Sequence, residues 1–393
     1  MRDLTCGIPL QLMTPSVTSP DIPSTCRYVP SACLQDKAVS RCDRDSEGPR
    51  GAVNSRRHGP HLLQIGTVVA NVARRAVAEQ LTLGDGDSFP SLTDKQRDLL
   101  NASVAIEQQD AVEAGAIGYT ARIWAQLSLP YRNPGERSDW ERRNGSLTLT
   151  ITPAVLRDAD GNRTRGYPYG VVPRYLLGWL TSEAVRTRSP EIPVGDSLRH
   201  FMSKLGMTST GGRNGSITRV SEQMRRLFGA TMHVEDVRNQ GDRWTLAGAN
   251  FSVADSYRLW FNAGDTPGEN PLWGSTVTLS DKFFQDIVNS PVPVDTRALS
   301  ALGGSAMRID LYTWLCHRMS YLRKPQVVTW SQLAQQFGSD YSKLKHFVEA
   351  LMRQLPAVLA VYPTARVSVV DGGIMLQPSP TPVPMRQRRT ELI

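Results

Sequence analysis

Hydrophobic positions recur at helical spacing directly after the glycine-rich residues 211–215. Over residues 216–228 the apolar side chains lie three or four positions apart, which places them on one side of a helix. They are Ile217, Val220, Met224, Leu227 and Phe228. Arg219, Arg225 and Arg226 lie away from this stripe. A helix with one apolar and one basic face is typical of a recognition helix in a DNA major groove, and a solvated arginine face on a surface helix has the same pattern.

The segments on either side of this helix predict a winged helix, in which a helix-turn-helix is followed by a β-hairpin. Upstream, the pattern indicates two helices separated by a short strand at residues 191–194. Ser216 is expected to cap the recognition helix with its hydroxyl. Downstream, residues 230–237 and 243–253 alternate apolar and polar side chains, as a hairpin does. The predicted order is therefore helix, strand, helix, helix, hairpin.

The same order of elements then repeats. Helical and alternating patterns predict a long helix, a short strand, a short helix, a second recognition helix and three strands, over residues 297–322, 327–329, 330–337, 341–355, 358–362, 366–370 and 374–376. The outward face of the second recognition helix carries Lys343, Lys345, His346 and Arg353, and Arg366 lies in the expected wing. Two winged-helix patterns in tandem are much less expected by chance than one.

These patterns predict an α+β protein with two tandem winged-helix domains and a disordered N-terminal leader. Residues 1–60 are rich in Pro, Ser, Thr and Arg and are expected to be the leader. Residues 61–116 are expected to hold short helices of uncertain role. The first winged-helix domain, with a preceding strand, is expected over 117–265 and the second over 266–378. Residues 379–393 are expected to form a flexible basic tail.

Composition favours a polyanionic partner. The 393 residues include 45 Lys and Arg against 37 Asp and Glu, which gives a net charge of +8. No run of eighteen apolar residues and no secretory signal pattern is present, so we expect a cytoplasmic protein without a membrane span. Four of the five cysteines lie in the leader, at Cys6, Cys26, Cys33 and Cys42, and match no zinc pattern.

The motifs of the common catalytic classes are absent from the sequence. The histidines supply no His-apolar-His pair of the kind that holds the metal of rolling-circle nicking enzymes; they are His58, His61, His200, His233, His317 and His346. The sequence contains no GxxxxGK[ST] phosphate loop, no GxSxG and no HExxH. We therefore expect no enzyme activity, no cofactor and no metal. A nicking or priming enzyme built from scattered carboxylates is the weakest alternative.

From Ile117 to Val383 the chain resembles the plasmid-encoded RepA replication initiators. The stretches that carry the resemblance are 118–122, 129–132, 142–152, 167–177, 195–198, 211–228, 333–338, 360–363 and 378–383. The resemblance implies a protein that binds repeated sequences in double-stranded plasmid origin DNA. It also implies recruitment of host replication proteins, such as the host initiator and the replicative helicase, and a homodimer that represses its own promoter.

The DNA-binding residues that we expect are basic side chains of both recognition helices, one loop and one wing. They are Arg213, Arg219, Arg225, Arg226, Lys343, Lys345, His346, Arg353 and Arg366. Arginine can bond bidentately to guanine, whereas lysine and wing residues are expected at phosphates. For each single side chain, an ordinary solvated role is the alternative. For the whole chain, the alternative is a sequence-specific transcriptional repressor that has no role in initiation.

Overall fold

The structure is a computed structural model and describes residues 93–157, 161–207, 215–240, 243–259, 274–338 and 341–384. All described residues belong to one compact unit of the chain. The expected leader, the helices expected before residue 93 and the last part of the expected basic tail lie outside the described residues. The described part mixes helices and strands, which confirms the predicted α+β class. None of its helices is long and apolar enough to cross a membrane.

The second predicted repeat is present in the structure as an ordered series of helices and strands. Its elements are α9 (Ala306–Tyr321), β12 (Gln326–Thr329), α10 (Trp330–Phe337), α11 (Leu344–Ala360), β13 (Arg366–Val370) and β14 (Gly373–Gln377). The three strands form one antiparallel sheet in the order β12-β14-β13. The turn between the last two strands contains Gly372 at a φ of 80°, a conformation that glycine adopts without steric cost. The strands expected over 366–370 and 374–376 are therefore present and joined by a tight turn.

Two expected elements of this repeat are wrong. No strand forms over 358–362, because residues 358–360 are the last turn of α11, which runs to Ala360. The helix expected over 297–322 is two helices, α8 (Thr296–Leu302) and α9, separated at Gly303 and Gly304. A Cβ on Gly303 would lie 2.0 Å from the Tyr175 hydroxyl, so the chain breaks where another helix comes close.

The first repeat has the same order of elements, except that a further hairpin over residues 231–252 comes between its third helix and its last two strands. It comprises α4 (Val171–Thr187), β6 (Glu191–Pro193), α5 (Gly195–Lys204), α6 (Ser216–Gly229), β9 (Ala254–Arg258) and β10 (Thr276–Leu279). These strands form an antiparallel sheet in the order β6-β10-β9, which is the arrangement of β12-β14-β13. The domain boundary expected at 265/266 therefore falls between two strands of one sheet.

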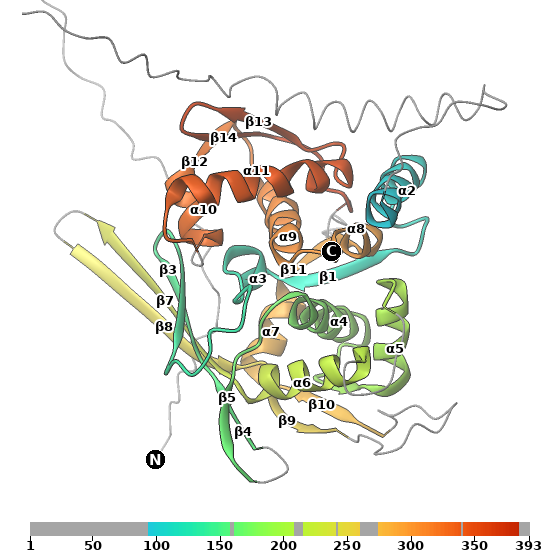
Figure 1. Cartoon of the computed structure of the whole chain (residues 1–393), viewed down its shortest axis with the longest axis vertical. Helices are drawn as coiled ribbons and strands as arrows, with labels where there is room; N and C mark the ends of the chain where they lie inside the picture. The colour runs from blue at the N-terminus through green and yellow to red at the C-terminus, as the bar shows by residue number, and fades with distance from the viewer. Residues whose placement is uncertain are drawn as a thin grey trace, which may run out of the picture. The chain divides into compact units, whose positions relative to one another are not determined.

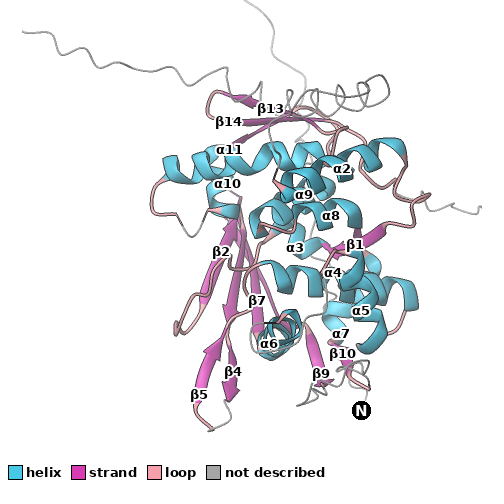
Figure 2. Cartoon of the chain, turned by 45° about the vertical axis from the view of Figure 1, so that its right-hand side comes forward, coloured by secondary structure: helices cyan, strands magenta, loops and turns pink. Residues whose placement is uncertain are grey.

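The hairpin predicted as the first wing belongs to a different sheet. It consists of β7 (Thr231–Gln240) and β8 (Arg243–Ser252), and β7 pairs with β3 (Leu147–Thr152), which pairs with β2 (Trp140–Asn144). The far end of the hairpin projects from the body of the unit (Figures 1 and 2). Alternation along a strand shows that it has two unlike faces but does not show which strands it joins.

The remaining described elements connect or cover the two repeats. They are α2 (Asp94–Gln108), β1 (Ile117–Ala121), α3 (Arg122–Gln126), β4 (Ala154–Arg157), β5 (Arg163–Gly166), α7 (Asp281–Asn289) and β11 (Pro291–Asp295). β1 and β11 pair as a two-stranded sheet, and β1 packs on α4 while β11 packs on α9 (Figure 1). The first helix of each repeat therefore contacts the same small sheet.

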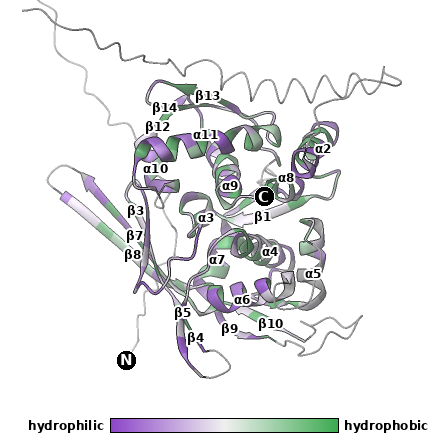
Figure 3. Ribbon diagram, viewed as in Figure 1, coloured by the Kyte–Doolittle hydropathy of each residue, from purple (hydrophilic) through white to green (hydrophobic). Residues whose placement is uncertain are grey.

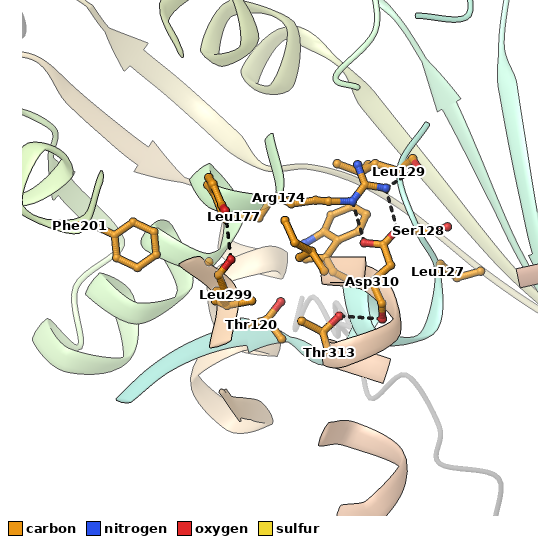
Figure 4. Close-up of a pocket in the computed structure, with 14 residues that line it drawn as sticks. Thr120, Leu127, Ser128, Leu129, Arg174, Leu177, Phe201, Leu299, Asp310 and Thr313 are labelled. Carbon is orange, nitrogen blue, oxygen red and sulfur yellow. Dashed lines mark hydrogen bonds and ion pairs between the residues drawn. The ribbon is translucent and has the colours of Figure 1, made fainter. Parts of the chain in front are cut away.

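A buried ion pair joins the first helices of the two repeats. The Arg174 side chain of α4 is 5% exposed, and its Nε and Nη2 lie 2.7 Å from the two carboxylate oxygens of Asp310 in α9. The same guanidinium donates to the main-chain carbonyl of Leu129 at 2.7 Å (Figure 4) and to that of Gly170 at 2.6 Å. Desolvation, with Asp310 adding to it, raises the pKa of the neighbouring Tyr131 phenol far above its ordinary value.

Arg174→Met is expected to lower the free energy of unfolding by about 3–5 kcal/mol, because it leaves the Asp310 carboxylate buried without its cation. Arg174→Met combined with Asp310→Leu removes that carboxylate and is expected to recover part of the loss. The Leu129 and Gly170 carbonyls still lack their donor in the double variant, so recovery is incomplete. Urea unfolding at pH 7 measures both values. A loss below about 1 kcal/mol for the single variant would show that water reaches the pair.

Candidate nucleic-acid interface

The stripe predicted for the first recognition helix is confirmed in α6. Val220, Met224, Leu227 and Phe228 are all buried, and the Phe228 ring lies 5.5 Å from that of Tyr257 in β9. The expected cap is wrong, because the helix begins at Ser216 and Gly215 occupies the N-cap position. The helix is thus fixed to its repeat by one apolar side, as the spacing indicates.

The three arginines expected on the outward face of α6 have three different environments. Arg219 is exposed, as expected. Arg225 is half-buried, and its Nη2 donates to the main-chain carbonyl of Arg157 at 3.0 Å. The face therefore has one exposed arginine near the start of the helix, Arg219, and a second, Arg225, whose guanidinium already donates to a carbonyl of the protein.

Arg226 is mostly buried, contrary to the expectation that it lies on the outward face of α6. Its side chain is 12% exposed, forms an ion pair with Glu222 one turn earlier, and places its guanidinium 5.3 Å from the centre of the Tyr169 ring. Arg219, Glu222 and Arg226 lie along one flank of α6, and the segment preceding α4 covers only the C-terminal part of that flank. The backbone N–H of Tyr169 donates to Gln223 of α6, which fixes the covering segment there. Periodicity cannot reveal a cover of this kind, since it comes from elsewhere in the chain.

The helix expected to be the second recognition helix, α11, exposes most of the basic residues predicted for it. Its Phe347, Leu351 and Leu355 are buried, whereas Leu344 at its start is 48% exposed. Lys345, His346 and Arg353 are exposed on the helix. Lys343 is exposed at the N-cap position rather than within the helix. These side chains are placed to meet an anion that approaches α11.

The two other predicted site residues lie away from the helices. Arg366 is the exposed first residue of β13, where its backbone N–H donates to Ser379 Oγ at 2.9 Å. Arg213 lies outside the described residues. Arg366 therefore lies in the strand expected over 366–370, and the DNA-binding role of both residues stays a prediction.

Sequence reasoning missed a set of arginines beside α6. β4 and β5 form a hairpin that packs on α6 and carries exposed arginines at Arg157, Arg163 and Arg165. Figure 3 shows hydrophilic residues along β5. The alternation Arg163-Thr164-Arg165 was an available signal for a strand with one cationic face, but only the adjoining turn stands out in the sequence.

Titratable groups in the interior have pKa values shifted by burial. Desolvation raises the pKa of the Asp286 carboxyl to about 6, and it lowers the pKa of the His317 imidazole to about 4. Within the described ranges no group of three or more His, Cys, Asp or Glu side chains could hold a metal ion. The basic side chains that α6, α11 and the β4–β5 hairpin expose, among them Arg219, Lys345 and Arg163, can bind anions.

A family model described as plasmid-encoded RepA protein matches residues 167–332. The matched span starts just before α4 and ends in α10, so it includes α6 and the buried pair of Arg174 and Asp310. The resemblance is therefore confirmed over residues 167–332, where the chain is similar to plasmid-encoded RepA protein.

Two solved structures of domains 2 and 3 of RctB are distantly similar to the chain. A selenomethionine derivative is 13% identical and covers 65% of this chain and 96% of its own, with a TM-score of 0.42. The second is 12% identical and covers 64% of this chain and 93% of its own, with a TM-score of 0.38. No curated protein matches the chain.

Arg226→Gln is expected to lower the free energy of unfolding by about 1–3 kcal/mol, because it removes a largely buried charge that has an ion-pair partner and a stacked ring. Arg219→Gln, on the same flank of α6, is expected to stay within about 0.5 kcal/mol of the unchanged protein. Chemical unfolding of the two variants provides the comparison. Equal and small effects would mean that the Arg226 guanidinium lies in water.

Proposed function

We propose that the two repeats are winged helices and that the chain is a plasmid replication initiator that binds repeated sequences in double-stranded origin DNA. The observation that carries the proposal is the repetition itself. Apart from the β7–β8 hairpin, which follows α6 in the first repeat, the order helix, strand, helix, helix, strand, strand occurs twice with the same sheet arrangement, β6-β10-β9 and β12-β14-β13. The third helix of each repeat buries one side and exposes basic residues on another. A winged helix uses this helix to enter the major groove.

The basic residues divide by chemistry into two roles. Arg219 of α6 and Arg353 of α11 are exposed guanidiniums, which can bond bidentately to the O6 and N7 of guanine, a contact worth about 1–3 kcal/mol of discrimination. Lys343, Lys345 and Arg366 lie at a helix start and a strand start, where they meet phosphates and set the register. His346 is exposed between these groups and contacts either.

The rest of the proposal follows from the family. The chain acts without a cofactor or catalysis of its own, in the cytoplasm, and recruits the host initiator and the replicative helicase to the bound origin. A homodimer bound at the promoter of its own gene represses transcription. The family match supports these roles for the matched residues 167–332.

Two experiments on DNA flanking the gene test the proposal. Footprinting with the full chain is expected to show regularly spaced protections, whereas a single promoter site would indicate a repressor. Supplying the gene in trans to a plasmid that carries only the origin is expected to support replication. Failure of replication with normal promoter repression would overturn the initiator role. Metal-dependent nicking of supercoiled origin DNA would instead show an enzyme.

Lys343→Gln combined with Lys345→Gln is expected to weaken binding to origin and unrelated duplexes by similar factors, because phosphate contacts carry no sequence information. The slope of log K against log salt is expected to become shallower by about 1.8, at about 0.9 for each phosphate. Fluorescence anisotropy titrations over a range of KCl concentrations measure the slope. Lys95→Gln with Arg97→Gln on α2 removes the same charge elsewhere and should leave it unchanged. A loss confined to origin DNA would assign these lysines to base reading.

A further inference from the structure

The β4–β5 hairpin has two unlike faces. Its register pairs Ala154 with Gly166, Val155 with Arg165, Leu156 with Thr164 and Arg157 with Arg163. Directly opposed residues of an antiparallel pair point to the same face. One face therefore carries small and apolar groups together with Thr164, and the other carries Val155, Arg157, Arg163 and Arg165.

The first face lies against α6 at very short range. A Cβ on Gly229, at the end of α6, would lie 2.8 Å from the Cβ of Ala154. A Cβ on Gly166 would lie 3.0 Å from Cγ of Arg226 and 2.5 Å from Cδ1 of Leu156. The two glycines thus allow the strands to approach the helix more closely than any larger residue would.

Three arginines hold the hairpin in this position. The bond from Arg225 Nη2 to the Arg157 carbonyl ties β4 to α6, and the mostly buried Arg226 fills the space beside Gly166. On the other strand, Arg165 Nη1 donates to the main-chain carbonyl of Glu136 at 3.2 Å. The hairpin is therefore anchored both to the proposed recognition helix and to the loop before β2.

The second face is exposed and cationic. Val155 is 59% exposed, and Arg157, Arg163 and Arg165 are all exposed. The two strands contain no acidic residue; the connecting residues Asp158 and Asp160 lie outside the described part of the chain. Three guanidiniums on one face, with no carboxylate among them, match the repeating negative charge of a nucleic-acid backbone.

We propose that the β4–β5 hairpin is a DNA-binding arm of the first repeat, in which Arg157, Arg163 and Arg165 bind backbone phosphates of duplex DNA beside α6. The inference rests on the proposed function, because it requires α6 to lie on the duplex. Arg225 and Arg226 then act as positioning residues that hold the arm. The arm's cationic face has no aromatic side chain on which an unpaired base could stack, which favours a duplex over a single strand.

The test compares three variants of the full chain on a footprinted origin duplex, an unrelated duplex and a single strand. R157Q/R163Q/R165Q is expected to make the slope of log K against log salt shallower by about 2.7, from three phosphates at about 0.9 each. Affinity is expected to fall by the same factor on both duplexes, so the preference for the origin remains. R157K/R163K/R165K keeps the charges and is expected to retain a slope near that of the unchanged protein.

A matched control removes the same charge from other surfaces. K95Q/R97Q/R186Q neutralises three exposed basic side chains on α2 and α4 and is expected to leave the slope unchanged. Far-UV circular dichroism and thermal unfolding confirm that each variant is folded. Because Arg165 also donates to the Glu136 carbonyl, thermal unfolding of R157Q/R163Q/R165Q is compared with that of R157K/R163K/R165K to show whether the hairpin stays in place.

The outcomes distinguish failure of the proposed arm from failure of the proposed function. Duplex binding by the unchanged protein, with an equal salt slope in the arm and control variants, would overturn the arm and leave the initiator proposal standing. Failure of the unchanged protein to bind any duplex would overturn both. A loss of single-strand binding alone would show that the arm holds an opened strand rather than the duplex.

Discussion

The buried ion pair of Arg174 and Asp310 is the contact on which the arrangement of the two repeats depends. A guanidinium taken out of water must be satisfied by several acceptors at once, and Arg174 meets this need with a carboxylate from α9 and main-chain carbonyls of Leu129 and Gly170. Such bonds are directional, unlike apolar contacts. They therefore set how α4 and α9 meet, and with them the helices that each repeat presents.

The same arginine is connected to the proposed DNA-binding surface through a short stretch of chain. The Gly170 carbonyl that accepts from Arg174 follows Tyr169, whose backbone N–H donates to Gln223 and whose ring lies against the Arg226 guanidinium. Arg226 in turn lies beside Gly166 at the end of the hairpin. One continuous set of contacts therefore links Arg174 in the interior, the segment preceding α4, α6 and the β4–β5 hairpin.

The sequence predicted the faces of the helices but not what covers them. The apolar stripes of α6 and α11 and the order of elements in both repeats can be predicted from the sequence. Burial of one side of a helix requires apolar residues at regular spacing. The pairing of β7 with β3, the cover over Arg226 and the packing of β4 on α6 join segments far apart in the chain. Long-range partners of this kind leave no local period, so the sequence does not show that the β7–β8 hairpin joins another sheet or that Arg225 and Arg226 have protein partners.

The positions of these basic side chains decide which contacts with DNA each repeat would make. In α11, Lys345, His346 and Arg353 remain open on the helix itself, whereas α6 retains Arg219 and commits Arg225 and Arg226 to protein contacts. In the first repeat, the exposed arginines therefore lie mainly on the β4–β5 hairpin rather than on α6. Phosphate contacts position a protein, and contacts to base edges specify its site. If the hairpin binds as proposed, the first repeat contributes mainly affinity and register, and sequence preference comes mainly from α11.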